Sequence, residues 1–210
     1  MSKKNEIILQ GILEDCSPIT SINDVPFDGY IFFVSTVRTS GTVDEAVVIT
    51  DKTFDMLGIK LKHPIRIEGE VQIIKNFKTH HSIVCVYAYD VLPVQEKNWE
   101  YINHVYLQGV LGKTNVFRRT PYGKDIADIN VCTETCLRKS GRYIPTICWN
   151  KTARMVRHWE AGHGIIVEGY LQRRRYNKTH DDGRIEEKTV YEVSAYKVVD
   201  PDWGDIEDDT

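Results

Sequence analysis

Hydrophobic and polar residues alternate along most of the chain, which is the pattern of β-strands with one buried face. In the second half this alternation predicts five strands, at residues 105–111, 126–136, 142–149, 164–175 and 189–198. The segment 151–159, between the third and fourth of these strands, contains no Gly or Pro and predicts a short helix. The first half shows the same coarse pattern. The chain is therefore predicted to be all-β with little helix.

Turn-forming residues separate the last two strands and predict a hairpin between them. They are Asn177, Asp181, Asp182 and Gly183. This turn explains Asp181 and Asp182 better than a pair of catalytic carboxylates does. Five strands with one short helix between the third and the fourth match the OB fold, a small five-stranded barrel.

A repeat of two copies sets the predicted domain organisation. Four segments of the first half return in the same order in the second half. The first-half segments are 9–13, 52–56, 65–72 and 86–91, and their counterparts are 107–111, 151–155, 165–172 and 193–198. The offset grows at the last pair, which places an insertion in the final hairpin of the second copy. We expect two tandem OB-fold barrels, each with a short helix between strands 3 and 4. The expected parts are a barrel over 1–93, a linker over 94–102, a barrel over 103–199 and an acidic tail over 200–210.

Charge is distributed unevenly over these parts, although the net charge of the chain is only −3. Residues 1–100 hold 10 Lys and Arg against 14 Asp and Glu, residues 101–199 hold 17 against 10, and residues 200–210 hold 6 acidic residues and no basic ones. A basic block neutralises nucleic-acid phosphates whatever charge the rest of the chain carries. The charge distribution therefore favours nucleic-acid binding by the second half, although a merely solvated basic surface would have the same composition. The tail is expected to be disordered.

Several function classes are disfavoured by what the sequence lacks. There is no run of about 18 apolar residues and no signal peptide, so we expect a soluble, cytoplasmic protein. The five Cys include no CxxC pair and the seven His show no metal spacing, which argues against a disulfide framework, a metal site or a cofactor. GxSxG, Walker A and GxGxxG motifs are absent, so no enzymatic activity is expected.

A series of motifs in the second half points to one family. A strand ending in Gly and Leu is followed by Arg, Pro and a Gly-Lys step, then by a Trp with Lys and Ala, and then by a strand with Glu-Gly, Arg and Tyr. These motifs lie at 105–111, 118–124, 149–153, 161–176 and 191–195. In this order they resemble the single-stranded DNA-binding protein (SSB) family of bacteria and phages. The resemblance covers residues 103–199, whereas residues 5–92 match only through the repeat.

The resemblance implies sequence-nonspecific binding and protection of single-stranded DNA in replication, recombination or repair, in association with the nucleoid. Because SSB proteins commonly present four OB folds, it also implies a homodimer. The chain departs from the family at Thr114-Asn115, where an Asp-Pro step is usual, and near Cys136, where many members carry an aromatic residue. The family's tail often ends in a Pro-Phe tip that recruits replication and repair proteins. This tail ends without one, so recruitment would need Trp203 or Ile206 as its apolar anchor.

Unpaired DNA offers a charged backbone and exposed base faces, so a sequence-tolerant binder needs cations and aromatic platforms together. The second half interleaves both. The candidate binding residues are Arg118, Arg119, Tyr122, Lys124, Arg138, Arg142, Tyr143, Trp149, Lys151, Arg173, Arg175 and Tyr176. Tyr143 and Trp149 are an even number of residues apart, so they are predicted to share one face of a strand. By resemblance, these two and Tyr176 fall where the family carries base-stacking aromatics. A core position is the alternative for Trp149, and for Trp159 it is preferred.

The first half keeps the apolar skeleton of the repeat and loses most of this chemistry. Aligned through the repeat, Trp149 corresponds to Thr50, Arg118 to Thr20, and the segment 173–176 to 73–76. We expect a degenerate barrel used for contact between chains. A weak DNA contact is the alternative, through Lys75, Phe77, Lys78 and His80.

Two other functions remain open. One is an RNA-binding or primosome-type OB protein, because residue types alone do not separate RNA from DNA. The other is an adaptor whose barrels bind proteins. The Arg-rich, Tyr-bearing second half argues against the adaptor.

Overall fold

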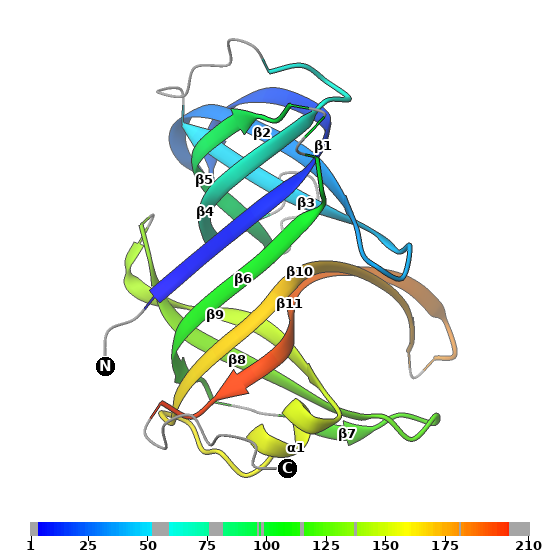
Figure 1. The fold of residues 1–210 in the computed structure, drawn as a ribbon. Helices are drawn as coiled ribbons and strands as arrows, with labels where there is room; N and C mark the ends of the chain where they lie inside the picture. Colours follow the sequence, from blue (N-terminus) through cyan, green and yellow to red (C-terminus); the bar gives the residue numbers. More distant parts are fainter. Residues whose placement is uncertain are drawn as a thin grey trace.

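The computed structural model describes residues 4–51, 59–75, 82–95, 97, 99–113, 116–136, 138–180 and 182–201. These residues form eleven strands and one short helix (Figure 1). The N-terminal strands are β1 (Lys4–Ile22), β2 (Val25–Val37), β3 (Val43–Asp51), β4 (Pro64–Lys75) and β5 (Ser82–Pro93). The C-terminal elements are β6 (Ile102–Leu111), β7 (Val116–Arg119), β8 (Asp125–Thr135), β9 (Arg138–Trp149), α1 (Lys151–Val156), β10 (Gly164–Thr179) and β11 (Ile185–Val199).

Each set of strands closes on itself. The N-terminal strands pair in the order β2-β3-β5-β4-β1, and an additional β1–β2 pairing closes the ring. The C-terminal strands pair in the order β6-β10-β11-β9-β8, closed by β6–β8, with β7 added beside β8. In both rings the third and fifth strands pair in parallel and the other neighbours are antiparallel. The prediction of an all-β, OB-type barrel is confirmed. The two rings are called the N-terminal and C-terminal barrels below.

The barrel interiors are filled by the apolar residues of the alternating pattern. Leu9 of β1 and Leu107 of β6 are completely buried, as are Ile67 and Val167 of the fourth strands. These residues belong to one continuous core cluster that extends through both barrels. The alternation in the sequence therefore marks the inner face of each strand.

The two barrels are joined by backbone pairing. Strands β1 and β6 run antiparallel, with Lys4 opposite Gln108 and Gln10 opposite Ile102. Figure 1 shows these two strands, in blue and green, side by side across the middle of the molecule. The eleven strands consequently form one continuous sheet.

The same side-chain contact recurs in both barrels. The amide of Asn5 donates to the carbonyl of Val71 (2.8 Å) and accepts from its N–H (2.9 Å). The amide of Asn103 makes the same pair of contacts with Leu171, at 2.8 and 2.9 Å. Each Asn continues the ladder between the first and fourth strands of its barrel at the point where the two strands diverge. The sequence repeat therefore extends to this structural detail.

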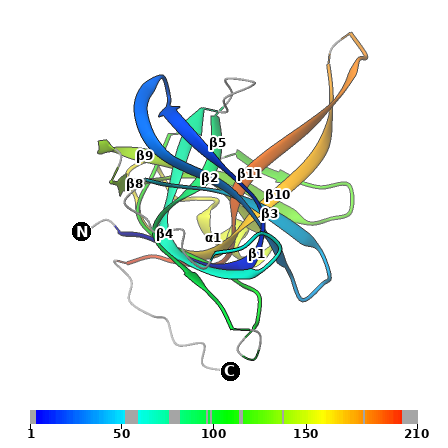
Figure 2. The ribbon, with the colours of Figure 1, turned by 90° about the horizontal axis from the view of Figure 1, so that it is seen from above.

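Several expected elements differ in extent from the observed ones. The helix ends at Val156 rather than 159, because Trp159 leaves the helix and stacks on His163 with ring centroids 4.6 Å apart. Strands β10 and β11 continue to Thr179 and Ile185, so the inserted residues lengthen the ladder (Figure 2). Strand β7 was not predicted, because four residues are too few to show an alternation. The helix expected in the first half falls at 52–58, and most of the tail at 202–210. Both lie outside the described residues.

Gly109 lies where β6 crosses β8 to close the C-terminal barrel. A Cβ at this position would lie 2.2 Å from the carbonyl oxygen of Cys132. We predict that Gly109→Ala lowers the free energy of unfolding by about 1–3 kcal/mol, because the backbone of β8 must move to make room. Gln108→Ala on the opposite face of β6 is the control. Equal urea-denaturation midpoints for the two variants would contradict this account of closure.

Candidate nucleic-acid interface

The aromatic candidates of β9 lie on the face that points away from the barrel core. Ile144 and Cys148 are buried in the core, and the β8–β9 ladder runs from Arg142 to Trp149 without a register shift. Tyr143 and Trp149 therefore share the opposite face, as predicted from their spacing. The surface formed by β7, β8, β9, β10 and β11 on the side that points away from the core is called the outer face.

Trp149 is held at the surface and does not fill the core. Its ring N–H donates to the hydroxyl of Ser194 on β11 at 3.3 Å, and its side chain is half-buried. Across the sheet, Trp149 pairs with Ile126, which in turn pairs with Arg118. The core alternative for Trp149 is therefore disfavoured. The half-buried indole lies at the outer face, two strands away from Arg118.

Tyr143 lies above the start of the loop that leads to β7. A Cβ on Gly112 would lie 2.8 Å from a ring carbon of Tyr143, so only glycine leaves room for the ring at this spot. The ring is nevertheless 54% exposed. Its position fits an accessible platform that is packed on one side.

The β7–β8 hairpin carries four of the candidates. Tyr122, at its tip, is 93% exposed, and Gly123 closes the turn with a φ of +77°. Arg118 forms an ion pair with Asp128 at 2.8 Å, and Arg119 lies 3.5 Å from Asp125. Lys124 is exposed at the end of the turn. The hairpin thus presents cations and one fully accessible aromatic ring next to β9.

The three consecutive arginines of β10 point in alternate directions, because successive side chains of a strand lie on opposite faces. Leu171 is in the core, so Arg173 and Arg175 lie on the inward side of the strand and Arg174 on the outer face. Arg173 reaches the N-terminal barrel and pairs with Glu45 at 2.8 Å. Arg174 pairs with Glu192 at 2.8 Å and lies over the Tyr176 ring at 5.1 Å.

From the sequence, all three arginines were counted as basic residues and Arg173 and Arg175 were selected as binding candidates, whereas Arg174 is the arginine of this run that lies beside Tyr176. The signal was available, because a core leucine at 171 fixes the direction of every later side chain on the strand. Among the remaining candidates, Arg142 is half-buried, Lys151 is exposed at the first position of α1, and Arg175 lies 3.8 Å from Glu187. The side chain of Arg138 falls outside the described part of the chain.

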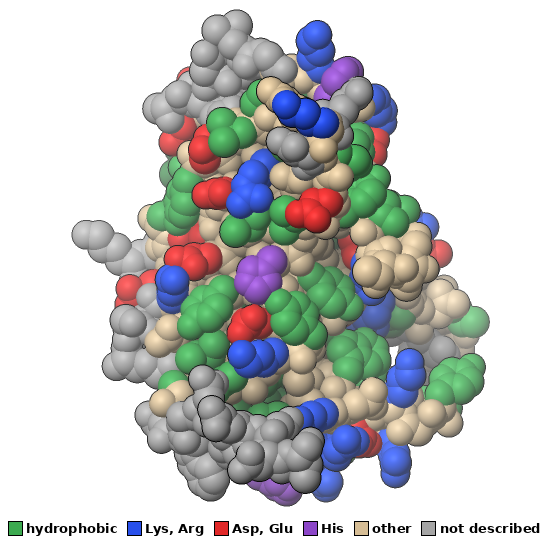
Figure 3. All heavy atoms as spheres, in the orientation of Figure 1, with side chains coloured by type: hydrophobic (Ala, Val, Ile, Leu, Met, Phe, Trp, Pro, Cys, Tyr) green, Lys and Arg blue, Asp and Glu red, His purple; other side chains and the backbone are tan. Residues whose placement is uncertain are grey.

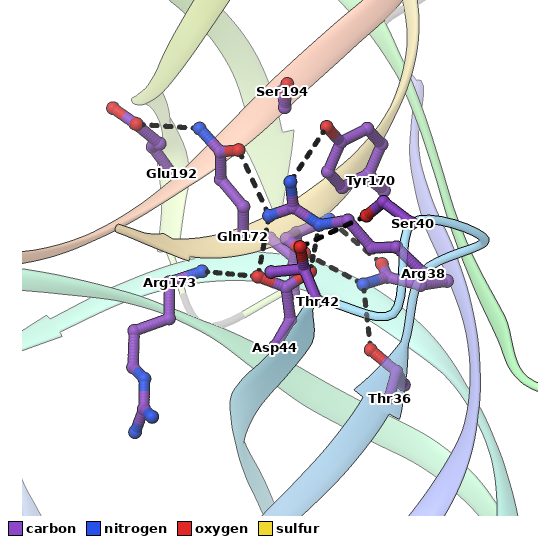
Figure 4. Close-up of polar contacts among 12 residues, drawn as sticks. Thr36, Arg38, Ser40, Thr42, Asp44, Tyr170, Gln172, Arg173, Glu192 and Ser194 are labelled. Carbon is purple, nitrogen blue, oxygen red and sulfur yellow. Dashed lines mark hydrogen bonds and ion pairs between the residues drawn. The ribbon is translucent and has the colours of Figure 1, made fainter. Parts of the chain in front are cut away.

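A buried polar network joins this region to the N-terminal barrel (Figure 4). Arg38 binds both oxygens of Asp44, at 2.5 and 2.7 Å, and lies over the Tyr170 ring at 4.7 Å. Asp44 is only 2% exposed and also accepts from the backbone N–H of Arg173 at 3.1 Å. Hydrogen bonding to Asp44 raises the pKa of Arg38, so the guanidinium stays charged. The β2–β3 hairpin is thereby fixed to the edge of β10.

The network continues to the outer face. Arg38 donates to Gln172 at 3.3 Å, Gln172 donates to Glu192 at 2.8 Å, and Glu192 also accepts from Arg174. Side chains of the first half therefore set the position of the Arg174–Tyr176 pair. Nothing in the sequence pattern indicated Arg38, Asp44 or Gln172, because their roles depend on how the two barrels dock.

The corresponding face of the N-terminal barrel has different chemistry. Ile49 pairs with Tyr87 as Ile147 pairs with Ser194, and Tyr87 and Ser194 are repeat equivalents. Asp51, not Thr50, is therefore the counterpart of Trp149, which corrects the alignment made from sequence alone. Asp51 accepts from the Tyr87 hydroxyl at 3.2 Å, where Trp149 contacts Ser194.

Apolar side chains cover much of the remaining N-terminal face. Val47, Ile49, Ile74 and Cys85 are buried there in a second hydrophobic cluster, with Phe27 packed against it. Following the same register, Glu45 takes the place of Tyr143. The described part of this face thus offers carboxylates and apolar groups where the C-terminal barrel offers aromatic platforms and cations.

The thiols are free, and the described histidines and cysteines form no metal cluster. All five Cys are free, and burial raises the pKa of Cys148 to about 12 and that of Cys16 to about 11. Among the residues that the structure describes, no three His, Cys, Asp or Glu gather closely enough to hold a metal ion. Nor does this part of the chain contain a helix long and apolar enough to cross a membrane.

Comparison with known proteins bears on the C-terminal barrel in particular. Residues 102–199 match the model of the single-strand binding protein family. The C-terminal barrel belongs to this family. The resemblance noted in the sequence is thereby confirmed. SSB family proteins are non-enzymatic binding proteins, which agrees, for this barrel, with the expectation that there is no enzymatic activity.

Solved SSB structures share the fold of nearly the whole chain. The wild-type single-stranded DNA binding protein from Thermus aquaticus matches with a TM-score of 0.73 and 17% identity, over 96% of this chain and 94% of that chain. A deletion mutant of the same protein matches with a TM-score of 0.70 and 18% identity, over 95% of each chain. At this identity the likeness shows the fold alone. No curated protein sequence matches the chain.

Replacing Arg38 tests the network that joins the N-terminal barrel to the SSB-family barrel. We predict that Arg38→Met lowers the free energy of unfolding by about 3 kcal/mol, because it leaves the buried Asp44 carboxylate without its charged partner. Arg66→Met is the control, since its ion pair with Glu68 is exposed and should matter by less than about 1 kcal/mol. Equal losses in urea denaturation would show that the Arg38–Asp44 pair does not hold the barrels together.

Proposed function

We propose that this protein binds and protects single-stranded DNA without sequence preference, in replication, recombination or repair. The observation that carries the proposal is the outer face of the C-terminal barrel, where Tyr143, Trp149 and Tyr176 lie among arginines on a barrel of the SSB family. The names of the family and of the structural matches support the same ligand.

The proposed contacts divide into two kinds. Arginine and lysine side chains of the β7–β8 hairpin and of β10 bind phosphates, which fixes the strand on the barrel without reading its sequence. Tyr143, Trp149 and Tyr176 stack on bases, and each base stacked contributes about 1–3 kcal/mol. Every base has a flat face, so this arrangement tolerates any sequence. Arg174, over the Tyr176 ring, adds a cation beside a platform.

We further propose that the chain arose by duplication of one OB barrel. The proposed parts are a barrel over 1–93, a linker over 94–102, a barrel over 103–199 and an acidic tail over 200–210. The shared strand order and the matching contacts of Asn5 and Asn103 support this division. The N-terminal barrel, with Asp51 and Glu45 on its corresponding face, acts as a structural support rather than as a second DNA site.

The resemblance to the family supports a proposal for the assembly and its setting. Two barrels per chain fit a homodimer that presents four OB folds to one strand, in the cytoplasm at the nucleoid. Recruitment of replication or repair proteins through the tail would use Trp203 or Ile206 as the apolar anchor.

The test is fluorescence anisotropy of a labelled oligo-dT strand against a duplex of the same length, over a series of salt concentrations. We predict tight binding of the single strand only, with log K falling by about 0.7 per log unit of salt for each phosphate neutralised. Trp149→Ala should weaken binding roughly 5- to 150-fold, the loss of one stacked base. Trp159→Phe, in the ring pair with His163, should leave it unchanged.

Three outcomes would contradict the proposed function. Equal affinity for single strand and duplex DNA would refute a function in single-strand binding. Absence of binding at low salt would favour the adaptor function. Tighter binding of oligo-U than of oligo-dT would favour RNA as the ligand.

A further inference from the structure

Positive charge on the C-terminal barrel is not concentrated where the arginine run suggests. Arg173, Arg174 and Arg175 each have a carboxylate within 3.8 Å, from Glu45, Glu192 and Glu187 respectively. The β10–β11 hairpin is further neutralised by Glu186, which accepts from both Lys188 and His180 at 2.9 Å. The arginines of this hairpin therefore offer a bound phosphate less uncompensated charge than their number suggests.

The excess of positive over negative charge lies instead on β7, the turn after it and α1. Residues 116–128 and 151–158 together contain six Lys and Arg against only two acidic residues. The cations are Arg118, Arg119, Lys124, Lys151, Arg154 and Arg157, and the carboxylates are Asp125 and Asp128. This set of six cations is called the β7–α1 strip. Figure 3 shows Lys and Arg side chains gathered over the lower part of the molecule, where Figure 1 draws β7 and α1.

Specific contacts make the strip one surface. The carboxylate of Asp125 lies 2.8 Å from Arg154 of α1 and 3.5 Å from Arg119 of β7, so a single acidic group holds two guanidiniums near each other. Arg157, just beyond α1, lies over the ring of Phe117 at 4.6 Å. Helix and hairpin are therefore fixed side by side, with the side chains of Arg119 and Arg154 more than half exposed.

The strip adjoins the part of the outer face that carries the aromatic residues. Arg118, Ile126 and Trp149 pair across β7, β8 and β9, so Arg118 lies two strands from Trp149, about 10 Å away. Trp149 also immediately precedes Asn150 and the start of α1. A DNA strand stacked on Trp149 has two ways to continue, along the largely charge-compensated β10–β11 hairpin or onto the cationic strip.

We propose that the β7–α1 strip is a second contact region. It binds the phosphodiester backbone of the DNA strand where that strand leaves the aromatic residues of the outer face. The inference rests on the proposed function and adds Arg154 and Arg157 to the interface. Beside α1 its ligand is the backbone, because Phe117, the aromatic ring there, is covered by Arg157 and packs against the core, whereas the accessible ring of Tyr122 lies at the tip of the β7–β8 hairpin. The strip accordingly adds affinity and salt dependence without adding base preference.

The test compares two lengths of oligo-dT, about 4 and about 16 nucleotides, which are the short and long ends of OB-fold site sizes. We expect Arg154→Gln with Arg157→Gln to leave binding of the short strand unchanged. For the long strand the salt slope should fall by about 1.4, which is about 0.7 for each phosphate that is no longer neutralised. A matched double control, Arg66→Gln with Lys197→Gln, removes the same charge from β4 and β11 and should change neither slope.

The possible outcomes distinguish failure of the strip proposal from failure of the proposed function on which it rests. If both variants lower the long-strand slope equally, the effect is one of net charge and the strip is refuted. If short and long strands lose affinity alike, α1 belongs to the stacking site and no second region exists. If the unaltered protein does not prefer single strands, the proposed function itself fails.

Because Arg154 pairs with the nearly buried Asp125, the double variant requires a check of its folding by thermal denaturation. Arg157→Gln alone leaves that ion pair intact and should still lower the long-strand slope by about 0.7. An unchanged slope in this folded single variant would also refute the strip.

Discussion

Antiparallel pairing between β1 and β6 is the interaction on which the rest of the structure depends. It joins two closed barrels into one sheet and brings the β2–β3 hairpin of the first against the edge of β10 in the second. Asp44 and Asn103 then satisfy the backbone N–H groups of Arg173 and Leu171 along that edge. An exposed edge of this kind would otherwise pair with other strands.

The direction of side chains along each strand converts this scaffold into a binding surface. Core residues at Ile144, Cys148 and Leu171 place Tyr143, Trp149 and Arg174 on the opposite side. The Arg38–Gln172–Glu192 contacts then hold Arg174 beside Tyr176. In this account the first barrel contributes to binding by fixing the geometry of the second, although its own face carries Asp51 and Glu45.

Much of the fold and of the candidate site was predictable from local sequence patterns, and the remainder depended on tertiary contacts. Alternation gave the strands of the second half to within a few residues, the repeat indicated a second copy, and spacing gave the common face of Tyr143 and Trp149. Four-residue β7 was too short to show a pattern. The counterpart of Trp149 was assigned one residue away from Asp51, because an alignment without strand register cannot fix it. The roles of Arg38 and Asp44 could not be recognised, since apart from each other their partners are Tyr170, Gln172 and the backbone of Arg173, more than a hundred residues away in the other barrel.

The location of the bound strand is the central claim, and photo-crosslinking with a bromodeoxyuridine-substituted oligonucleotide tests it most directly. Crosslinked peptides identified by mass spectrometry should contain Tyr143, Trp149 and Tyr176 of the C-terminal barrel. Crosslinks confined to the N-terminal barrel, or to the face of β1 and β6 opposite the core, would contradict the account. They would place the nucleic acid on a surface that has neither the platforms nor the cations described above.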